Sequence, residues 1–297
     1  MKIIIEIVLY NKKINDSTTF ISLDNHKTII NQLFSQIELL IYDNSSTPQI
    51  FDIVNSFSAI YKSNTKNGGV SAAYNYAFDI AKKKNFKWML LLDQDTELNE
   101  NYFIELKRIL KKIESSKDVV AIVPKIYNEK NKFSPSKVLW GGVHRPIDSS
   151  YIGEYEDELM AIGSCTVLRT SFIKSIDGFS RLFWLDCLDR WLFHKIHKKN
   201  KSVYILRSKI SHELSILNFN KFMNVKKYHN QVLYEAIFML KYKNLSETLF
   251  FLLRLIRRAI YLFIQTRNIN YSICSLSIII KILFSGFNTS RLIKSKL

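Results

Sequence analysis

The chain has few of the residues that interrupt or cross-link a fold. Its 297 residues include only 4 prolines and 8 glycines, which argues against long linkers and low-complexity segments, and no internal repeat is visible. The three cysteines, Cys165, Cys187 and Cys274, are odd in number and lack the spacing of metal ligands. Because no secretory signal stands at the N-terminus either, we expect a reducing, cytoplasmic compartment rather than a disulfide framework.

Composition and charge narrow the class of protein. Hydrophobic residues make up 47% of the chain and aromatic residues 13%, enough for one large domain or a domain with an appendage. The net charge of +17 implies an anionic partner, which could be nucleic acid, an acidic membrane surface or phosphorylated substrates. The chain has no zinc-finger spacing, RNA-binding aromatic signature or heptad-linked basic region, so we expect no nucleic-acid partner.

The organising stretch is an apolar run that starts at Trp88 and ends in two carboxylates, Asp93 and Asp95. Such a run is typical of a strand buried on both faces of a parallel sheet, and ligands bind beyond the carboxyl ends of these strands. Two neighbouring carboxylates repel each other unless a cation relieves them, so the natural complement is Mg²⁺ or Mn²⁺. The alternative is a strand followed by a polar turn with two solvated acids.

The first half of the chain alternates strand and helix patterns. We expect strands at residues 2–9, 37–42, 59–62, 87–92 and 119–123, and helices at 25–34, 70–84 and 99–113. This order predicts an α/β domain with a mostly parallel sheet. The glycine pair before the second helix allows a close backbone approach, and that helix N-terminus would offer its free N–H groups to a diphosphate.

The next part of the chain is less regular. Residues 125–160 read as an irregular polar excursion, and residues 161–168 as a return strand whose Gly163 and Ser164 are small enough to face a ligand. Asp186 and Asp189 are three apart, so on a helix they share one face near its N-terminus, where the dipole alone would favour acids. His212 falls in a polar turn, where a histidine is more often ordinary than a ligand.

These pieces, taken together over residues 2–215, resemble glycosyltransferase family 2, the GT-A type nucleotide-sugar transferases, and in particular its bacterial rhamnosyltransferase-like branch. The matching segments, in the family's order, are Tyr10-Asn11, Asp43-Asn44-Ser45-Ser46, Asn67-Gly68-Gly69 through Asn75, Leu92-Asp93-Gln94-Asp95-Thr96, Leu185-Asp186-Cys187-Leu188-Asp189 and His212. Each segment alone is a weak signal. Several in register are a strong one, and glutamine between the two aspartates is typical of the rhamnosyltransferase branch.

The resemblance implies a role for each matching residue. The residues expected to contact the nucleotide sugar are Tyr10, Asn11, Asp43, Asn67, Gly68, Gly69, Asn75, Asp93 and Gln94. The residues expected to contact the sugar or the acceptor are Trp140, Gly163, Ser164 and Trp184. The metal ligands would be Asp93, Asp95 and His212.

The catalytic base would be Asp189, favoured over Asp186. The chain departs from the family where an acidic pair and an arginine usually close the base-bearing helix, because Asp189-Arg190-Trp191 and His194-Lys195 stand there. The proline common after Tyr-Asn is replaced by Lys12.

The expected function is an inverting, metal-dependent transfer of a sugar to a glycan or lipid-linked glycan in bacterial surface polysaccharide synthesis. By branch resemblance the donor is dTDP-rhamnose, while a UDP-hexose or UDP-galactofuranose stays open. A non-catalytic protein that binds membranes or polyanions is the alternative from another class.

We expect two domains, a GT-A α/β domain over residues 1–217 with a Rossmann-like sheet, and an α-helical extension over residues 218–297. In the extension, leucine and isoleucine recur at helical spacing from Leu245 onward, and Arg254, Arg257 and Arg258 cluster on the other side. Such basic amphipathic helices could lie on an anionic membrane surface, which would make the protein peripheral at the inner face of the cell membrane. The alternatives are packing over the catalytic domain or a homo-oligomer contact.

Overall fold

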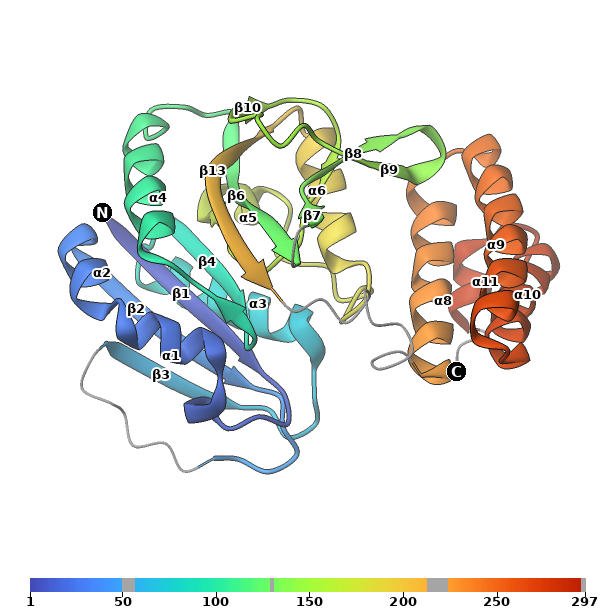
Figure 1. Ribbon diagram of the computed structural model, residues 1–297, viewed down its shortest axis with the longest axis horizontal. Helices are drawn as coiled ribbons and strands as arrows, with labels where there is room; N and C mark the ends of the chain where they lie inside the picture. Colours follow the sequence, from blue (N-terminus) through green and yellow to red (C-terminus); the bar gives the residue numbers. More distant parts are fainter. Residues whose placement is uncertain (50–56, 129–130, 213–223, 295–297) are drawn as a thin grey trace. The chain divides into compact units, whose positions relative to one another are not determined.

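The computed structural model describes residues 1–49, 57–128, 131–212 and 224–294 (Figure 1). The chain divides into two compact units. The first unit comprises Met1–Lys137 and Arg145–Glu213, and the second comprises Val138–His144 and Leu214–Leu297. The domain boundary expected after residue 217 lies outside the described residues and stays a prediction.

One large, mostly parallel sheet forms the centre of the first unit. Its strands follow the spatial order β10-β13-β6-β12-β4-β1-β2-β3. They are β1 (Lys2–Leu9), β2 (Gln36–Asp43), β3 (Ser58–Ser63), β4 (Trp88–Asp93), β6 (Val119–Asn128), β10 (Gly153–Tyr155), β12 (Thr166–Arg169) and β13 (Ser202–His212). Strand β12 runs antiparallel to both β4 and β6, and β10 runs antiparallel to β13. The expected α/β architecture is confirmed.

Short strands complete the first unit. Strand β5 (Thr96–Glu97) pairs with β13, and β7 (Asn131–Ser134) pairs with β6. A separate three-stranded sheet contains β11 (Leu159–Met160), β8 (Ser136–Leu139) and β9 (Val143–Pro146). Residues 125–160, expected to be irregular, therefore contain several strands, and Lys125 itself is buried in β6.

Helices cover both faces of the sheet. They are α1 (Thr18–Asn25), α2 (Lys27–Leu33), α3 (Gly69–Lys83), α4 (Glu100–Lys112), α5 (Thr170–Ser175) and α6 (Leu188–Lys198). Alternate residues of β1, such as Ile5 and Ile7, share one core with α1, α2 and α4, while α3 packs against β1 and β4 (Figure 1). Because both faces are covered, the strands read as continuous apolar runs, which is why the sequence identified them.

Three local predictions were wrong. Asp186 and Asp189 do not share a helix face, because α6 begins at Leu188 and Cys187 before it adopts the left-handed conformation with φ 63°. The return strand starts at Thr166 rather than residue 161, so Gly163 and Ser164 lie in the preceding loop. The backbone of His212 belongs to strand β13 rather than to a turn.

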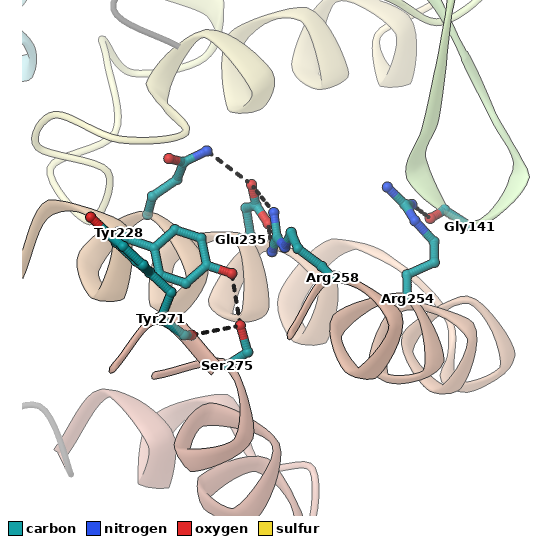
Figure 2. Close-up of polar contacts among 8 residues, drawn as sticks. Gly141, Tyr228, Glu235, Arg254, Arg258, Tyr271 and Ser275 are labelled. Atoms are coloured by element: carbon teal, nitrogen blue, oxygen red, sulfur yellow. Dashed lines mark hydrogen bonds and ion pairs between the residues drawn. The ribbon is translucent and has the colours of Figure 1, made fainter. Parts of the chain in front are cut away.

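The second unit consists largely of helices, namely α8 (Val225–Tyr242), α9 (Leu245–Thr266), α10 (Ile269–Phe284) and α11 (Thr289–Lys294). Helices α8, α9 and α10 pack against one another. Helix α9 begins with a capping box in which Asn244 and Glu247 satisfy each other's backbone N–H groups. The segment Val138–His144 joins this unit through the Arg254 guanidinium, which donates to the Gly141 carbonyl at 2.9 Å (Figure 2). Among the described residues, none of the helices has the length and apolar character that crossing a bilayer requires.

Glycine 69 fixes how α3 begins. Its φ is +72°, and an added Cβ would lie 2.2 Å from the Trp184 carbonyl oxygen. Gly286 has a similar φ of +61° but nothing within 4 Å of the same position. A substitution at Gly286 therefore measures the free-energy cost of the left-handed backbone alone, without a steric clash.

We expect Gly69→Ala to lower the free energy of unfolding by about 3 kcal/mol or more, because it combines left-handed strain with overpacking. Gly286→Ala, which meets strain alone, should lose about 1–2 kcal/mol. Chemical unfolding of both variants measures the difference. Equal losses of unfolding free energy in the two variants would show that the loop carrying Trp184 moves away from the added methyl group at no cost.

Candidate active site

The carboxyl ends of three neighbouring strands bring the predicted polar residues to one edge of the sheet. In the parallel register, Val8 of β1 pairs with Asp93 of β4, and Leu9 pairs with Asp43 of β2. Tyr10 follows directly after β1. This edge is where open α/β sheets bind their ligands.

Two residues at the start of α1 hold the backbone of Asp93 and Gln94 at the end of β4. The Ser17 hydroxyl, which also caps α1, donates to the Gln94 carbonyl at 2.8 Å. The Thr19 hydroxyl donates to the Asp93 carbonyl and accepts from the Thr96 N–H at 2.8 Å. These bonds fix the direction in which the Asp93-Gln94-Asp95 turn presents its side chains. The sequence analysis did not identify Ser17 or Thr19, since a capping serine before a helix carries no sign of a distant partner.

Gly163 and Ser164 link this turn to the candidate base. The Ser164 hydroxyl, fully buried, accepts from the Asp93 N–H at 2.9 Å and bonds to the Thr96 hydroxyl at 2.7 Å. The Gly163 N–H donates to Asp189 Oδ2 at 3.0 Å, and a Cβ on Gly163 would lie 2.6 Å from Asp189 Oδ1. Two successive residues therefore hold the backbone of Asp93 and the carboxylate of Asp189.

Asp189 has the properties of a general base. It lies in the first turn of α6 and is partly buried. Burial, followed by the negative charge of Asp93, raises its pKa to about 7, while the hydrogen bond from the Gly163 N–H acts in the opposite direction. A pKa near neutrality suits an acid–base group, because the base form is populated and still takes a proton. Asp186 lies before α6, outside the first helical turn that contains Asp189.

Two further groups near this edge were missed by the sequence analysis. Glu6 is 1% exposed in the middle of β1, and neither of its carboxylate oxygens has a hydrogen-bond partner. Burial, and then the charge of Asp93, raises the pKa of Glu6 well above its ordinary value. Burial and the charges of Asp93, Asp189 and Glu6 likewise raise the pKa of the Tyr74 phenol. The one signal for Glu6 was an acid inside the apolar run of β1.

Asp43 is engaged within the protein. The carboxylate is fully buried and accepts from the Gln49 amide at 2.9 Å, the Tyr61 hydroxyl at 2.8 Å and the Ser45 N–H at 2.9 Å. This network holds Ser45 and Gln49, which follow β2, against Tyr61 of β3. A direct contact of Asp43 with a nucleotide stays a prediction.

Tyr10 and Asn11 form the other side of this edge. The Tyr10 N–H donates to Gln94 Oε1 at 2.8 Å, and the Tyr10 side chain is 52% exposed. Asn11 has a left-handed backbone with φ 51°, and its N–H donates to Ser45 Oγ at 2.9 Å. Gln94, predicted to bind the donor, thus also positions the backbone of Tyr10.

Some backbone N–H groups at the N-terminus of α3 donate to other atoms of the protein. The Gly69 N–H donates to Asn67 Oδ1 at 3.2 Å, and the Ser71 N–H donates to the Trp184 carbonyl at 3.0 Å. Two of the N–H groups that the sequence predicted to be open to a diphosphate are therefore occupied. The space left by the missing Gly69 side chain is filled by Trp184.

Asn75, predicted to contact the nucleotide, holds a loop in place. Its side-chain amide donates to the Phe179 carbonyl at 3.0 Å and accepts from the Phe179 N–H at 2.9 Å. This loop leads into α6 and Asp189. Asn75 thus acts on the site through the backbone of the loop.

A divalent cation fits the chemistry of this edge. Asp93 and Asp95 supply the hard oxygen ligands that Mg²⁺ and Mn²⁺ prefer, and the charge of Asp93 already opposes ionisation of Asp189 and Glu6. The backbone of His212 pairs with Thr96, the residue after Asp95, while its side chain lies outside the described part of the chain. The described side chains contain no cluster of three or more histidine, cysteine or acidic ligands. Trp140, a predicted contact of the sugar or the acceptor, belongs to the second unit, and its ring is tilted against that of Phe250 with 5.0 Å between the ring centroids.

The family model for glycosyl transferase family 2 matches residues 23–177, just over half of the chain. The chain belongs to glycosyltransferase family 2. Its reaction class is therefore glycosyl transfer, and the α/β unit with its curled, mostly parallel sheet is the expected GT-A fold. The family match contains both the Asp93–Asp95 turn and the Gly163–Ser164 link.

Comparisons with other known proteins give weaker likenesses. The chain resembles the crystal structure of S. aureus TarS with a TM-score of 0.48 and 16% identity, covering 84% of this chain and 41% of that chain. TarS 1–349 in complex with UDP-GlcNAc gives a TM-score of 0.49 and 15% identity, covering 84% of this chain and 69% of that chain. No curated protein matches the chain. The family assignment rests on the sequence match.

The buried Glu6 carboxyl makes a prediction for stability. Its pKa is raised in the folded protein, so its contribution is fully present below the unfolded pKa and is lost as the pH rises through the folded pKa. We expect Glu6→Gln, which removes this ionisation, to gain thermal stability relative to the wild type as the pH is raised from about 5 to about 8.

Glu38 provides the matched control, because it is also buried in the sheet but forms an ion pair with Lys84 at 2.7 Å. Glu38→Gln should destabilise the protein by losing that pair. Thermal unfolding of the three proteins across the pH range gives the answer. A constant difference between Glu6→Gln and the wild type would contradict the account of Glu6.

Proposed function

We propose that this family 2 enzyme is an inverting, metal-dependent transferase that moves rhamnose from dTDP-rhamnose to a glycan or lipid-linked glycan in surface polysaccharide synthesis. The observation that carries the mechanism is the link from Asp189 through Gly163 and Ser164 to Asp93. It places a carboxyl group of pKa about 7 beside the turn expected to hold the donor diphosphate. A lipid-linked acceptor would make the protein peripheral at the cytoplasmic face of the cell membrane.

Asp189 is the proposed base. It takes the proton of the acceptor hydroxyl as that oxygen attacks the anomeric carbon, and the bond from this carbon to the nucleoside diphosphate breaks on the opposite face. One in-line displacement inverts the configuration without a covalent sugar–enzyme intermediate. The hydrogen bond from the Gly163 N–H orients Asp189 Oδ2, which leaves Oδ1 for the acceptor.

The donor diphosphate is proposed to bind at the Asp93–Asp95 turn. Asp93 and Asp95, with His212 as a third ligand, would hold the Mg²⁺ or Mn²⁺ ion. When bound there, the ion would supply the positive charge that the departing diphosphate requires. Tyr10 would contact the nucleotide base, which its exposed ring directly after β1 supports.

The choice of sugar rests on the resemblance to the rhamnosyltransferase branch, carried by Gln94 between the two aspartates. Gln94 Oε1 accepts from the Tyr10 N–H, so Gln94 would connect the proposed metal ligands to the proposed nucleotide contact. A UDP-hexose or UDP-galactofuranose donor would use the same base and the same metal ligands.

We expect Asp189→Asn to lower kcat by about 10²–10⁴-fold while donor binding is preserved, because the amide cannot take the proton but can still accept from the Gly163 N–H. Steady-state kinetics and donor binding on the same preparation measure the two effects. Asp186→Asn is the matched control and should retain most of the turnover, since Asp186 lies outside α6.

The pH profile provides a second reading of the same assignment. Because the base must be ionised, kcat/KM of the Mn²⁺-loaded enzyme should rise with pH along a limb that lies below about 7, since the cation offsets the charge of Asp93 that helps to raise the pKa of Asp189. A larger loss of turnover in Asp186→Asn than in Asp189→Asn would reverse the assignment.

The donor is tested by thermal stabilisation with nucleoside diphosphates, with and without Mn²⁺ or Mg²⁺. A ligand at 100 times its Kd stabilises the folded state by about 2.7 kcal/mol, so the shift is measurable without knowing the acceptor. We expect metal-dependent stabilisation by dTDP to exceed that by UDP, and Asp93→Asn to abolish the metal dependence. Stronger stabilisation by UDP would change the sugar, and none by any nucleotide would contradict the proposed function.

A further inference from the structure

Helices α9 and α10 each have two apolar faces, and the second unit uses only one of them. The inner face of α9 includes Phe251, Leu255 and Leu262, which are buried among the other helices of the unit. The inner face of α10 includes Ile278 and Ile282, which are fully buried. These inner faces account for the packing of the unit.

The outer faces expose a second set of large apolar side chains. On α9 they are Leu249, Leu253, Ile256, Ile260, Phe263 and Ile264, which we name the α9 stripe. On α10 they are Ile269, Ile273, Leu276, Ile280, Leu283 and Phe284, which we name the α10 stripe. Successive members are mostly three or four residues apart, so each stripe lies along one side of its helix. Leu253 is 65% exposed and Phe284 is 86% exposed.

These stripes are exceptional within the chain. In the described part of the first unit the exposed large apolar side chains are scattered, such as Ile21 in α1 and Ile104 in α4, apart from the adjacent pair Tyr151 and Ile152. Contiguous apolar surface of this kind marks an interaction site, whereas scattered apolar residues need no explanation. The α9 stripe extends over about four helical turns, more than a ligand pocket needs.

The second unit is also strongly basic. From residue 214 to residue 297 the sequence has thirteen lysines and arginines against two glutamates and no aspartate. Both glutamates are engaged inside the unit. Glu235 pairs with Arg258 at 2.7 Å (Figure 2). Glu247 caps α9. Arg257 is exposed one residue after Ile256, so its charge borders the α9 stripe, and Arg267 is exposed at the end of α9.

We propose that the second unit docks on an anionic lipid surface, with the α9 and α10 stripes in the acyl boundary and the flanking arginines and lysines at the headgroups. An interfacial helix has this combination of an apolar face and a basic border. A second copy of the chain would bring another strongly positive unit against the first, which like-charge repulsion opposes. Nucleic acid would satisfy the charges but would leave the stripes without an apolar partner.

This inference rests on the proposed function in one respect: docking would bring the enzyme to a lipid-linked acceptor. Docking itself needs no turnover. It is therefore measured by co-sedimentation of the full chain with vesicles of phosphatidylglycerol and phosphatidylcholine, and with vesicles of phosphatidylcholine alone.

The stripe variant is Leu253→Ser, Ile256→Ser, Ile260→Ser, and its matched control is Ile21→Ser, Ile104→Ser, Ile152→Ser in the first unit. All six side chains are exposed, so both variants should fold, which circular dichroism checks. We expect the stripe variant to lose anionic-vesicle partitioning by about a hundredfold and the control to bind like the wild type.

The charge variant is Arg257→Gln, Arg267→Gln, with Lys2→Gln, Lys117→Gln as its control. We expect the charge variant to lose partitioning by about tenfold or more, and the wild type to bind anionic vesicles more weakly as salt is raised from roughly 0.1 M to 0.5 M. Equal binding to both kinds of vesicle would overturn the proposed anionic surface.

Three further outcomes would overturn the proposal. Unchanged vesicle binding in the stripe variant would show that the α9 stripe does not contact the lipid. A wild-type dimer in sedimentation velocity that the stripe variant breaks, without vesicle binding, would make a second copy the occupant. Binding to duplex DNA that the stripe variant retains, again without vesicle binding, would favour a polyanion. Nucleotide-dependent stabilisation of the same samples shows separately whether the donor site is intact.

Discussion

The negative charge of Asp93 is the constraint on which the candidate active site depends. It adds to the burial that raises the pKa of Asp189 to about 7, and to the burial that raises the pKa of Glu6 and Tyr74. A protein that places several acids at one end of a sheet must either keep some of them protonated or bring a cation to them. Under the proposed function the Asp93–Asp95 turn would bring the cation, and the ionisation of Asp189 would then follow its binding.

Geometry and charge are coupled here by backbone hydrogen bonds. Ser164 and Thr19 hold the Asp93 backbone from two sides, and Gly163 holds the Asp189 carboxylate. Asn75 holds the loop that leads into α6. Because each of these contacts joins residues distant in sequence, the site forms only when the whole sheet and its covering helices are in place.

Much of the fold could be predicted from local patterns. The strands β1 and β4 appear as apolar runs, and α4 appears as an amphipathic segment capped by Asn99, because both faces of the sheet are covered and the helix buries one side. The Asp93–Asp95 turn was placed correctly at the end of its strand for the same reason. Its roles in binding and catalysis remain proposals.

The rest could not be read locally. Whether Asp186 and Asp189 share a helix face depends on the left-handed backbone of Cys187, which the sequence does not predict. The role of Ser164 depends on the pairing of β12 with β4, and the membership of Val138–His144 in the second unit depends on contacts with α9 more than a hundred residues later. The outer apolar stripes were visible as periodicity, but only the fold separates them from the buried faces.

The most direct test of the account is anomalous diffraction from crystals grown with Mn²⁺ and dTDP. The account predicts a manganese peak between the carboxylates of Asp93 and Asp95, at about 2.0–2.3 Å from their oxygens, with the diphosphate on the same ion and Asp189 beside it. Nucleotide bound elsewhere, or manganese absent from this turn while bound nucleotide is clear, would contradict it.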